Sequence, residues 1–173
     1  MEPESPFADV LLANQAFGAT YHYGELKGRA LKGLAVLTCM DSRIDPLGMM
    51  GLSPGDAKIL RNAGARVTDD VLRTLVLAVY LLGVNRMMVV AHTDCRMTVG
   101  TEDAVHRAVA DAGGPDTRSL SFMTTSDLRE SLAQDVQKVR SSPYLGDLAV
   151  SGFIYHLDSG HLEEVPPRSP RDG

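Results

Sequence analysis

The sequence predicts one α/β domain built on a mostly parallel, four-stranded sheet with helices on both faces. Residues 34–39 and 86–91 are short, nearly continuous apolar runs, the pattern of strands buried on both faces of a sheet. Segments with helical spacing alternate with the strand segments, which is typical of parallel sheets joined by right-handed crossovers. The length of 173 residues fits a single domain with a sizeable core.

The strands are expected where apolar runs of strand length end at turn residues: 34–39, 57–62, 86–91 and 151–156, followed by a short edge segment ending near Val165. If the second strand lies on one side of the first and the third on the other, the winding direction reverses between the first and third strands. Ligand sites in open α/β sheets form at the carboxyl ends of strands at such a reversal. We therefore expect the strand order 2-1-3-4, with a site where the first and third strands end.

Helices are expected in the segments that carry helical spacing and capping residues: 6–17, a short one around 46–52, 71–82, 101–111 and 127–140. Ser5 is expected to cap the first and Ser126 the last. Thr68, with the acids Asp69 and Asp70, starts the helix over 71–82, and Gly83 ends it. That helix carries apolar side chains almost all round, which predicts deep burial.

Residues 1–165 are expected to form the domain, and its N-terminal helix is an arm that could pack on a neighbouring subunit. The last segment, 166–173, contains Pro and Arg and is expected to be disordered. Residues 22–33 and 113–125 are expected to be loops, because they hold glycines, Pro115 and polar residues.

Composition argues against two classes of partner. The net charge of -5, without a basic run, disfavours nucleic acid. The longest apolar stretch, 71–82, is interrupted by Arg73 and Thr74 and is too short to span a bilayer, and no signal-like segment follows the acidic start. We therefore expect a cytoplasmic protein, in a compartment where disulfides are uncommon.

Three metal-ligand side chains stand where two apolar runs end. Cys39 closes the run over 34–39, and His92 follows the run over 86–91, with Cys95 three positions later. Two thiolates and one imidazole suit tetrahedral zinc, and three protein ligands leave a fourth position open, as in catalytic sites. If a helix begins near Thr93, Cys95 falls in its first turn, where the helix dipole favours a thiolate.

Asp41 and Arg43 lie just beyond Cys39. Arg43 can hold Asp41 as a bidentate ion pair, and the guanidinium keeps the carboxylate ionised. Asp41 is then placed to accept a hydrogen from zinc-bound water or hydroxide. Without Arg43, Asp41 would be free to become a fourth ligand and close the site.

In combination these motifs resemble the β-class carbonic anhydrase signature, Cys39-x-Asp41-x-Arg43 with His92-x-x-Cys95. Further matches to the short prokaryotic members are Gly55-Asp56-Ala57, Arg61-Asn62-Ala63-Gly64, Thr68-Asp69-Asp70 and His92-Thr93-Asp94-Cys95. The similarity extends over about residues 8–165.

The resemblance implies one Zn²⁺ per chain, bound by Cys39, His92 and Cys95, with Asp41 and Arg43 as the catalytic dyad. It implies reversible hydration of CO₂ to bicarbonate. It also implies a dimer, tetramer or other assembly with active sites near the subunit interface.

Four further residues carry expectations. Asn62 and Gly64 are expected to shape a turn that lines the site, where Gly64 lets backbone approach substrate. Asp94 is expected to cap the helix after the third strand. Arg96 stands where family members commonly have Gly. It indicates either that ordinary helical dihedrals suffice there, or that a guanidinium narrows the entrance or supplies a charge for anions.

Several other functions fit part of the pattern. A hydrolase of COS or CS₂ on the same scaffold would keep the ligands and differ in its pocket. A non-catalytic zinc-binding regulatory protein would result if Arg96 blocked the site or Asp41 occupied the fourth position. A thiol-redox protein would need Cys39 and Cys95 to pair reversibly. A phosphatase is excluded by spacing, since the short turn after Cys39 leaves no phosphate-cradling loop.

Overall fold

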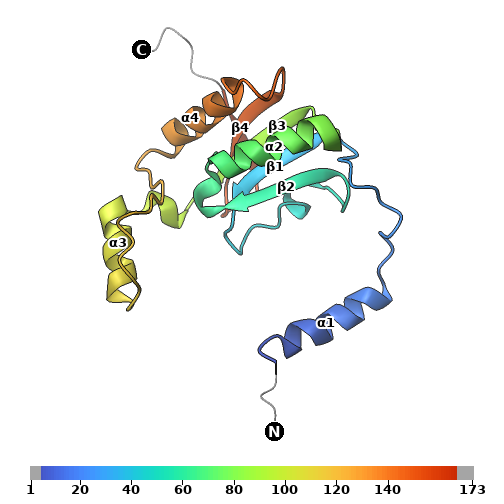
Figure 1. The fold of residues 1–173 in the computed structure, drawn as a ribbon, viewed down its shortest axis with the longest axis horizontal. Helices are drawn as coiled ribbons and strands as arrows, with labels where there is room; N and C mark the ends of the chain where they lie inside the picture. Colours follow the sequence, from blue (N-terminus) through green and yellow to red (C-terminus); the bar gives the residue numbers. More distant parts are fainter. Residues whose placement is uncertain (1–4, 167–173) are drawn as a thin grey trace.

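A computed structural model describes residues 5–166, so of the segment expected to be disordered only Pro166 lies within the described part. The chain forms a five-stranded sheet in the order β2-β1-β3-β4-β5 (Figure 1). The strands are β1 (Leu34–Cys39), β2 (Ala57–Asn62), β3 (Arg86–His92), β4 (Ala149–Tyr155) and β5 (Leu162–Val165). The first four pair in parallel and β5 is antiparallel to β4, which confirms the predicted order and edge segment.

The two central strands are buried because both faces of the sheet are covered where they lie. All six residues of β1 are buried, and β3 is exposed only at its first residue, Arg86. β4 begins at Ala149, two residues earlier than predicted, because Ala149 pairs with Arg86 and the two strands run together over their full length.

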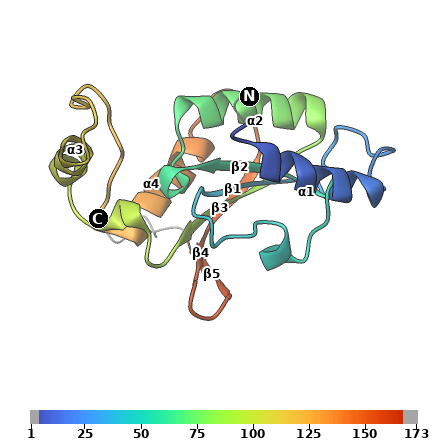
Figure 2. The same ribbon diagram turned by 90° about the horizontal axis from the view of Figure 1, so that it is seen from below.

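One face of the sheet is covered by two long helices, α2 (Asp69–Leu82) and α4 (Leu128–Arg140), whose buried residues belong to one core cluster. Figure 2 shows α2 lying along the sheet. They pack on side chains of β1, β3 and β4 that point to this face, among them Ala35, Leu37, Met87, Val89, Val150 and Ile154. The 3-10 helix η1 (Gly48–Met50) packs on the opposite face, against Leu34, Val36 and Val90. No helix within residues 5–166 has both the length and the apolar character needed to cross a membrane.

The prediction that the helix over 71–82 is deeply buried is wrong. In α2 the buried residues are Val71, Leu75 and Ala78, while Tyr80 and Leu81 are 64% and 65% exposed. The helix rests on a flat sheet face, so a single stripe of it reaches the core. An apolar surface is therefore left on its outer side.

The first helix, α1 (Ala8–Ala19), extends away from the sheet and contains no buried residue (Figure 1). It starts two residues later than predicted, and Ser5 does not cap it. The Ser5 hydroxyl instead accepts a hydrogen bond from the amide of Phe7, which precedes the helix. Apolar side chains on α1, including Val10, Leu11 and Leu12, are exposed.

The ends of the other helices follow local capping chemistry. Thr68 accepts from the amide of Val71 and Gly83 adopts a left-handed conformation, as expected for the start and end of α2. Asp127, not Ser126, caps α4 by accepting from the amide of Glu130, so the predicted cap is wrong by one residue.

The remaining helix, α3 (Glu102–Asp111), holds the loop that follows it through one carboxylate. Glu102 accepts hydrogen bonds from the amides of Phe122 and Thr124, at 2.9 and 2.8 Å. These amides lower the pKa of Glu102 from its ordinary value of 4.5. The carboxylate therefore anchors residues 122–124 to the start of α3.

We predict that this anchor is lost in acid. Because the folded-state pKa is lowered, the stabilisation is complete above about pH 4.5 and disappears as the pH falls through the lowered value. Hydrogen-exchange protection of the Phe122 and Thr124 amides should then decrease, and Glu102→Gln should show the same decrease at neutral pH. Asp103→Asn, which removes a charge from the same helical turn, should leave both amides protected. Equal protection in the two variants would contradict the role of Glu102.

Candidate metal centre

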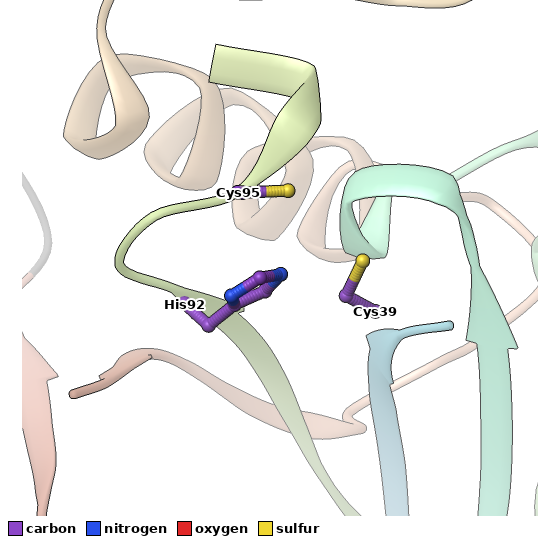
Figure 3. Close-up of side chains that lie close together, drawn as sticks. All are labelled: Cys39, His92 and Cys95. Carbon is purple, nitrogen blue, oxygen red and sulfur yellow. The ribbon is translucent and has the colours of Figure 1, made fainter. Parts of the chain in front are cut away.

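Three ligand atoms converge where β1 and β3 end. Cys39 is the last residue of β1, His92 is the last residue of β3, and Cys95 follows in the next turn. The two sulfur atoms and a ring nitrogen of His92 lie within 4.8 Å of one another, and all three side chains are buried (Figure 3). The cluster is able to bind a metal.

Strand pairing produces this arrangement. β1 and β3 are parallel neighbours, with Thr38 opposite Val90, so the residues that follow leave the sheet at the same edge. β1 also pairs with β2 on its other side, and the chain reverses its winding direction there. This edge is where α/β sheets form ligand sites.

The hydrogen bonds of His92 fit a metal ligand. Its Nδ1 lies 2.8 Å from the carbonyl oxygen of Thr93, so Nδ1 carries the proton and donates it. The other nitrogen, Nε2, is buried and has no hydrogen-bond partner within residues 5–166. A buried lone pair beside two sulfur atoms is satisfied by a cation such as zinc.

The two thiols affect each other's ionisation. The nearby Cys95 thiol is the largest influence that lowers the pKa of the Cys39 thiol, to about 3; His92 and the amide of Gly64, 3.3 Å from the sulfur, contribute as well. The same contact, together with burial, raises the pKa of Cys95. Burial disfavours charge on His92, but the Cys39 sulfur and the Thr93 carbonyl outweigh it and raise its pKa. A metal that binds here must displace the protons that these groups hold.

Asp41 and Arg43 form the predicted ion pair. Nε and Nη2 of Arg43 donate to the two oxygens of Asp41, at 2.9 and 2.7 Å, and the backbone amide of Arg43 donates to the same carboxylate. Arg43 holds the pKa of Asp41 far below its usual range, and the two carboxylates that it contacts raise the pKa of Arg43. Asp41 therefore stays ionised and can act only as an acceptor.

Asn62 and Gly64 shape the turn that follows β2. The side chain of Asn62 bonds both the amide and the carbonyl of Arg66, at 2.8 and 2.7 Å. Gly64 has a φ of +77°, and a Cβ there would lie 3.2 Å from Met97. The turn thereby directs the Gly64 amide at the sulfur of Cys39.

The segment after β3 differs from the prediction. No α-helix begins at Thr93; instead, Cys95 precedes a single 3-10 turn, η3 (Arg96–Thr98). Asp94 caps no helix, since it has a φ of +55° and its carboxylate accepts from Nη1 of Arg43 at 2.7 Å. This left-handed residue interrupts the chain where a helix would have started.

Arg96 is accommodated without a glycine. It is the first residue of η3, is exposed, and is not among the described non-glycine residues with positive φ. Ordinary helical dihedrals therefore suffice at this position.

Two contacts of this site were not predicted. Arg61 donates to the carbonyl oxygens of Cys39 and Asp41, at 2.9 and 2.7 Å, and so fixes the backbone beside the first ligand. Asp94 accepts from Arg43, as described above. The Arg61 contact could have been predicted from the pairing of the first two strands. Arg61 lies opposite Thr38, which puts a long cationic side chain beside the end of β1.

Comparison with known proteins identifies the family. Residues 34–162 match the family described as Carbonic anhydrase. The chain belongs to the β-carbonic anhydrase family. Beta-carbonic anhydrase 1 of Mycobacterium tuberculosis is 35% identical over 162 residues, which cover 92% of this chain and 98% of that protein.

Two further relatives place the chain within this family. The crystal structure of carbonic anhydrase from Streptococcus mutans superposes with a TM-score of 0.88 at 36% identity, over 95% of this chain and 99% of that one. A carbon disulfide hydrolase of Saccharolobus solfataricus is 41% identical over 170 residues, which cover 81% of this chain and 83% of that protein. The scaffold is therefore shared by β-carbonic anhydrases and by an enzyme named for a different substrate.

We predict that His92→Ala weakens zinc binding by more than about 100-fold, because even the partners that orient a ligand change metal affinity by about 10- to 100-fold. Competition with a chromophoric chelator measures this affinity. His161→Ala is the matched control, since His161 is exposed and outside the cluster, and it should bind zinc like the unmodified chain. Equal affinities of the two variants would show that His92 is not a ligand.

Proposed function

We propose that the protein is a zinc-dependent carbonic anhydrase that reversibly hydrates CO₂ to bicarbonate and a proton. The observation that carries this proposal is the Cys39–His92–Cys95 cluster with an ionised Asp41–Arg43 pair beside it. Membership of the β-carbonic anhydrase family supports it, as does the near-complete coverage of a carbonic anhydrase structure. We further propose one zinc per chain and a cytoplasmic location, where thiols stay reduced.

The ligand set would leave zinc an open position. Three protein ligands would leave one site of a tetrahedral zinc to solvent, and the bound ion would supply the Lewis acidity that ionises water near neutral pH. Cys39, His92 and Cys95 would hold the ion, while Nδ1 of His92 keeps its proton on the Thr93 carbonyl.

Asp41 orients the nucleophile. As an ionised carboxylate it accepts the hydrogen of the attacking O–H group and thereby turns a lone pair of that oxygen toward CO₂. Arg43 keeps Asp41 ionised and, by engaging both of its oxygens, holds it from becoming a metal ligand itself.

We predict that Asp41→Asn keeps its zinc but loses about 100-fold or more in kcat/KM for CO₂ hydration. A loss of this size is usual when a side chain that accepts or donates a proton in the reaction is removed. Stopped-flow hydration and metal analysis measure the two quantities. The matched control is Asp116→Asn, because Asp116 pairs with Arg118 in the same bidentate way away from the metal cluster. Full activity of Asp41→Asn would reject the catalytic role of Asp41.

Hydrolysis of CS₂ is a second candidate, favoured by the 41% identity to a carbon disulfide hydrolase. The ligands would be unchanged, and two waters would convert CS₂ to CO₂ and two H₂S. Parallel assays of CO₂ hydration and of H₂S release from CS₂ separate the two. Release of H₂S without CO₂ hydration would replace our proposal, and zinc binding with neither activity would favour a regulatory protein.

We also propose that the chain self-associates. α1 buries none of its residues and the outer side of α2 exposes Tyr80 and Leu81, so one chain leaves two apolar helix surfaces uncovered. A second copy covers both surfaces by two-fold symmetry, since a dimer repeats each contact. A dimer is the smallest assembly that covers the apolar surfaces of α1 and α2, and a tetramer would consist of two such dimers.

We predict that Leu11→Asp and Leu81→Asp each weaken the dimer about 1,000-fold, since each change removes one leucine from both copies and burying one leucine contributes about 2 kcal/mol. Sedimentation equilibrium measures the dissociation constant. Leu120→Asp is the control, because Leu120 is equally exposed but lies in the loop after α3. A monomeric unmodified chain, or equal effects of all three changes, would contradict this interface.

A further inference from the structure

Asp94 is bound to Arg43 through both its side chain and its backbone. The carboxylate accepts from Nη1 at 2.7 Å, and the carbonyl oxygen accepts from Nη2 at 3.1 Å. Together with the two bonds to Asp41, four of the five N–H groups of Arg43 are directed at these two acids. The guanidinium is therefore held from two sides.

These bonds join two segments that leave different strands. Arg43 lies in the turn after β1, which begins at the ligand Cys39, whereas Asp94 lies between the ligands His92 and Cys95 after β3. The two residues are 51 positions apart in the chain. The contact thus links the two halves of the metal cluster.

A second pair in the same molecule shows what Asp94 adds. Arg118 donates from its backbone amide, Nε and Nη2 to Asp116, as Arg43 does to Asp41. The Asp-x-Arg spacing alone therefore produces the bidentate pair. Within residues 5–166, the Arg118 guanidinium has no second carboxylate among its hydrogen-bond partners, so no such bond joins it to another segment of the chain.

Other bonds fix the backbone independently of Asp94. Arg61 holds the carbonyls of Cys39 and Asp41, and Thr93 is tied by its amide and hydroxyl to Tyr155 and Leu157. Removing the charge of Asp94 leaves these bonds in place. The change therefore frees the Arg43 side chain without unfolding the ligand loops.

We infer that Asp94 is a positioning residue for the reaction proposed above. It fixes the Arg43 guanidinium from the His92–Cys95 segment, and through Arg43 it fixes the direction in which the Asp41 carboxylate faces. Within residues 5–166, Asp94 makes no hydrogen bond to the side chains of Cys39, His92 or Cys95. The expected effect on catalysis rests on the proposed function. The expected effect on the Arg43 guanidinium rests on the hydrogen bonds alone.

Asp94→Asn is the test variant. Asparagine adopts the left-handed conformation that residue 94 has, so the backbone is kept while the charge is removed. We expect unchanged zinc content and a loss of about tenfold in kcat/KM for CO₂ hydration, because the Asp41 carboxylate would no longer be held in the direction that orients the attacking O–H group. In ¹⁵N-arginine-labelled zinc protein, the Nε–H of Arg43 should exchange with solvent at least about tenfold faster, because its guanidinium is no longer clamped.

Arg118 and Asp116→Asn are the controls. The Nε–H exchange rate of Arg118 should not change in Asp94→Asn. Asp116→Asn should raise the Nε–H exchange rate of Arg118 and should change neither the exchange rate of Arg43 nor kcat/KM. Unchanged Arg43 exchange in Asp94→Asn, or unchanged kcat/KM in an active enzyme, would overturn the positioning role. If the unmodified chain hydrates no CO₂, the proposed function fails, and Arg43 exchange still decides whether Asp94 holds the guanidinium.

Discussion

The parallel pairing of β1 with β3 is the constraint on which the rest of the site depends. Because the two strands are adjacent and in register, Cys39 and the His92–Cys95 segment leave the sheet at one edge. β1 lies between β2 and β3 and is buried along its whole length, so it is fixed at the centre of the sheet. Core packing therefore places Cys39 and His92 side by side, and the turn after β3 brings Cys95 to them.

Around this edge, long cationic side chains hold loops that carry no regular structure. Arg61 binds the backbone beside Cys39, and Arg43 connects the turn after β1 to the turn after β3. Farther out, Arg66 forms a buried ion pair with Asp135 of α4, at 2.6 Å, which fixes the turn that presents Gly64. Each arginine donates to several acceptors at once, which suits it to hold irregular backbone in place.

The sequence was informative where the signal is local or follows from topology. The apolar runs predicted β1 and β3. The strand order was predicted from a reversal of winding direction between these strands, which places Cys39 beside His92. The contact of Asp94 with Arg43 was not predictable, because it joins two residues that lie 51 positions apart in loops of no regular structure. The exposed side of α2 was misread for another reason: an apolar helix surface looks the same whether it meets its own sheet or a second chain.

The electrostatics of the site favour an open metal position. Two buried thiolates already balance a zinc dication, so a third anionic ligand would add net charge in a buried place, which is costly. Asp41 is the anion nearest at hand, yet both of its oxygens are engaged by Arg43, whose charge is shared with the exposed Asp94. The arginine therefore does two things at once. It keeps a carboxylate ionised beside the cluster, and because it engages both oxygens it would keep that carboxylate from binding a metal held there.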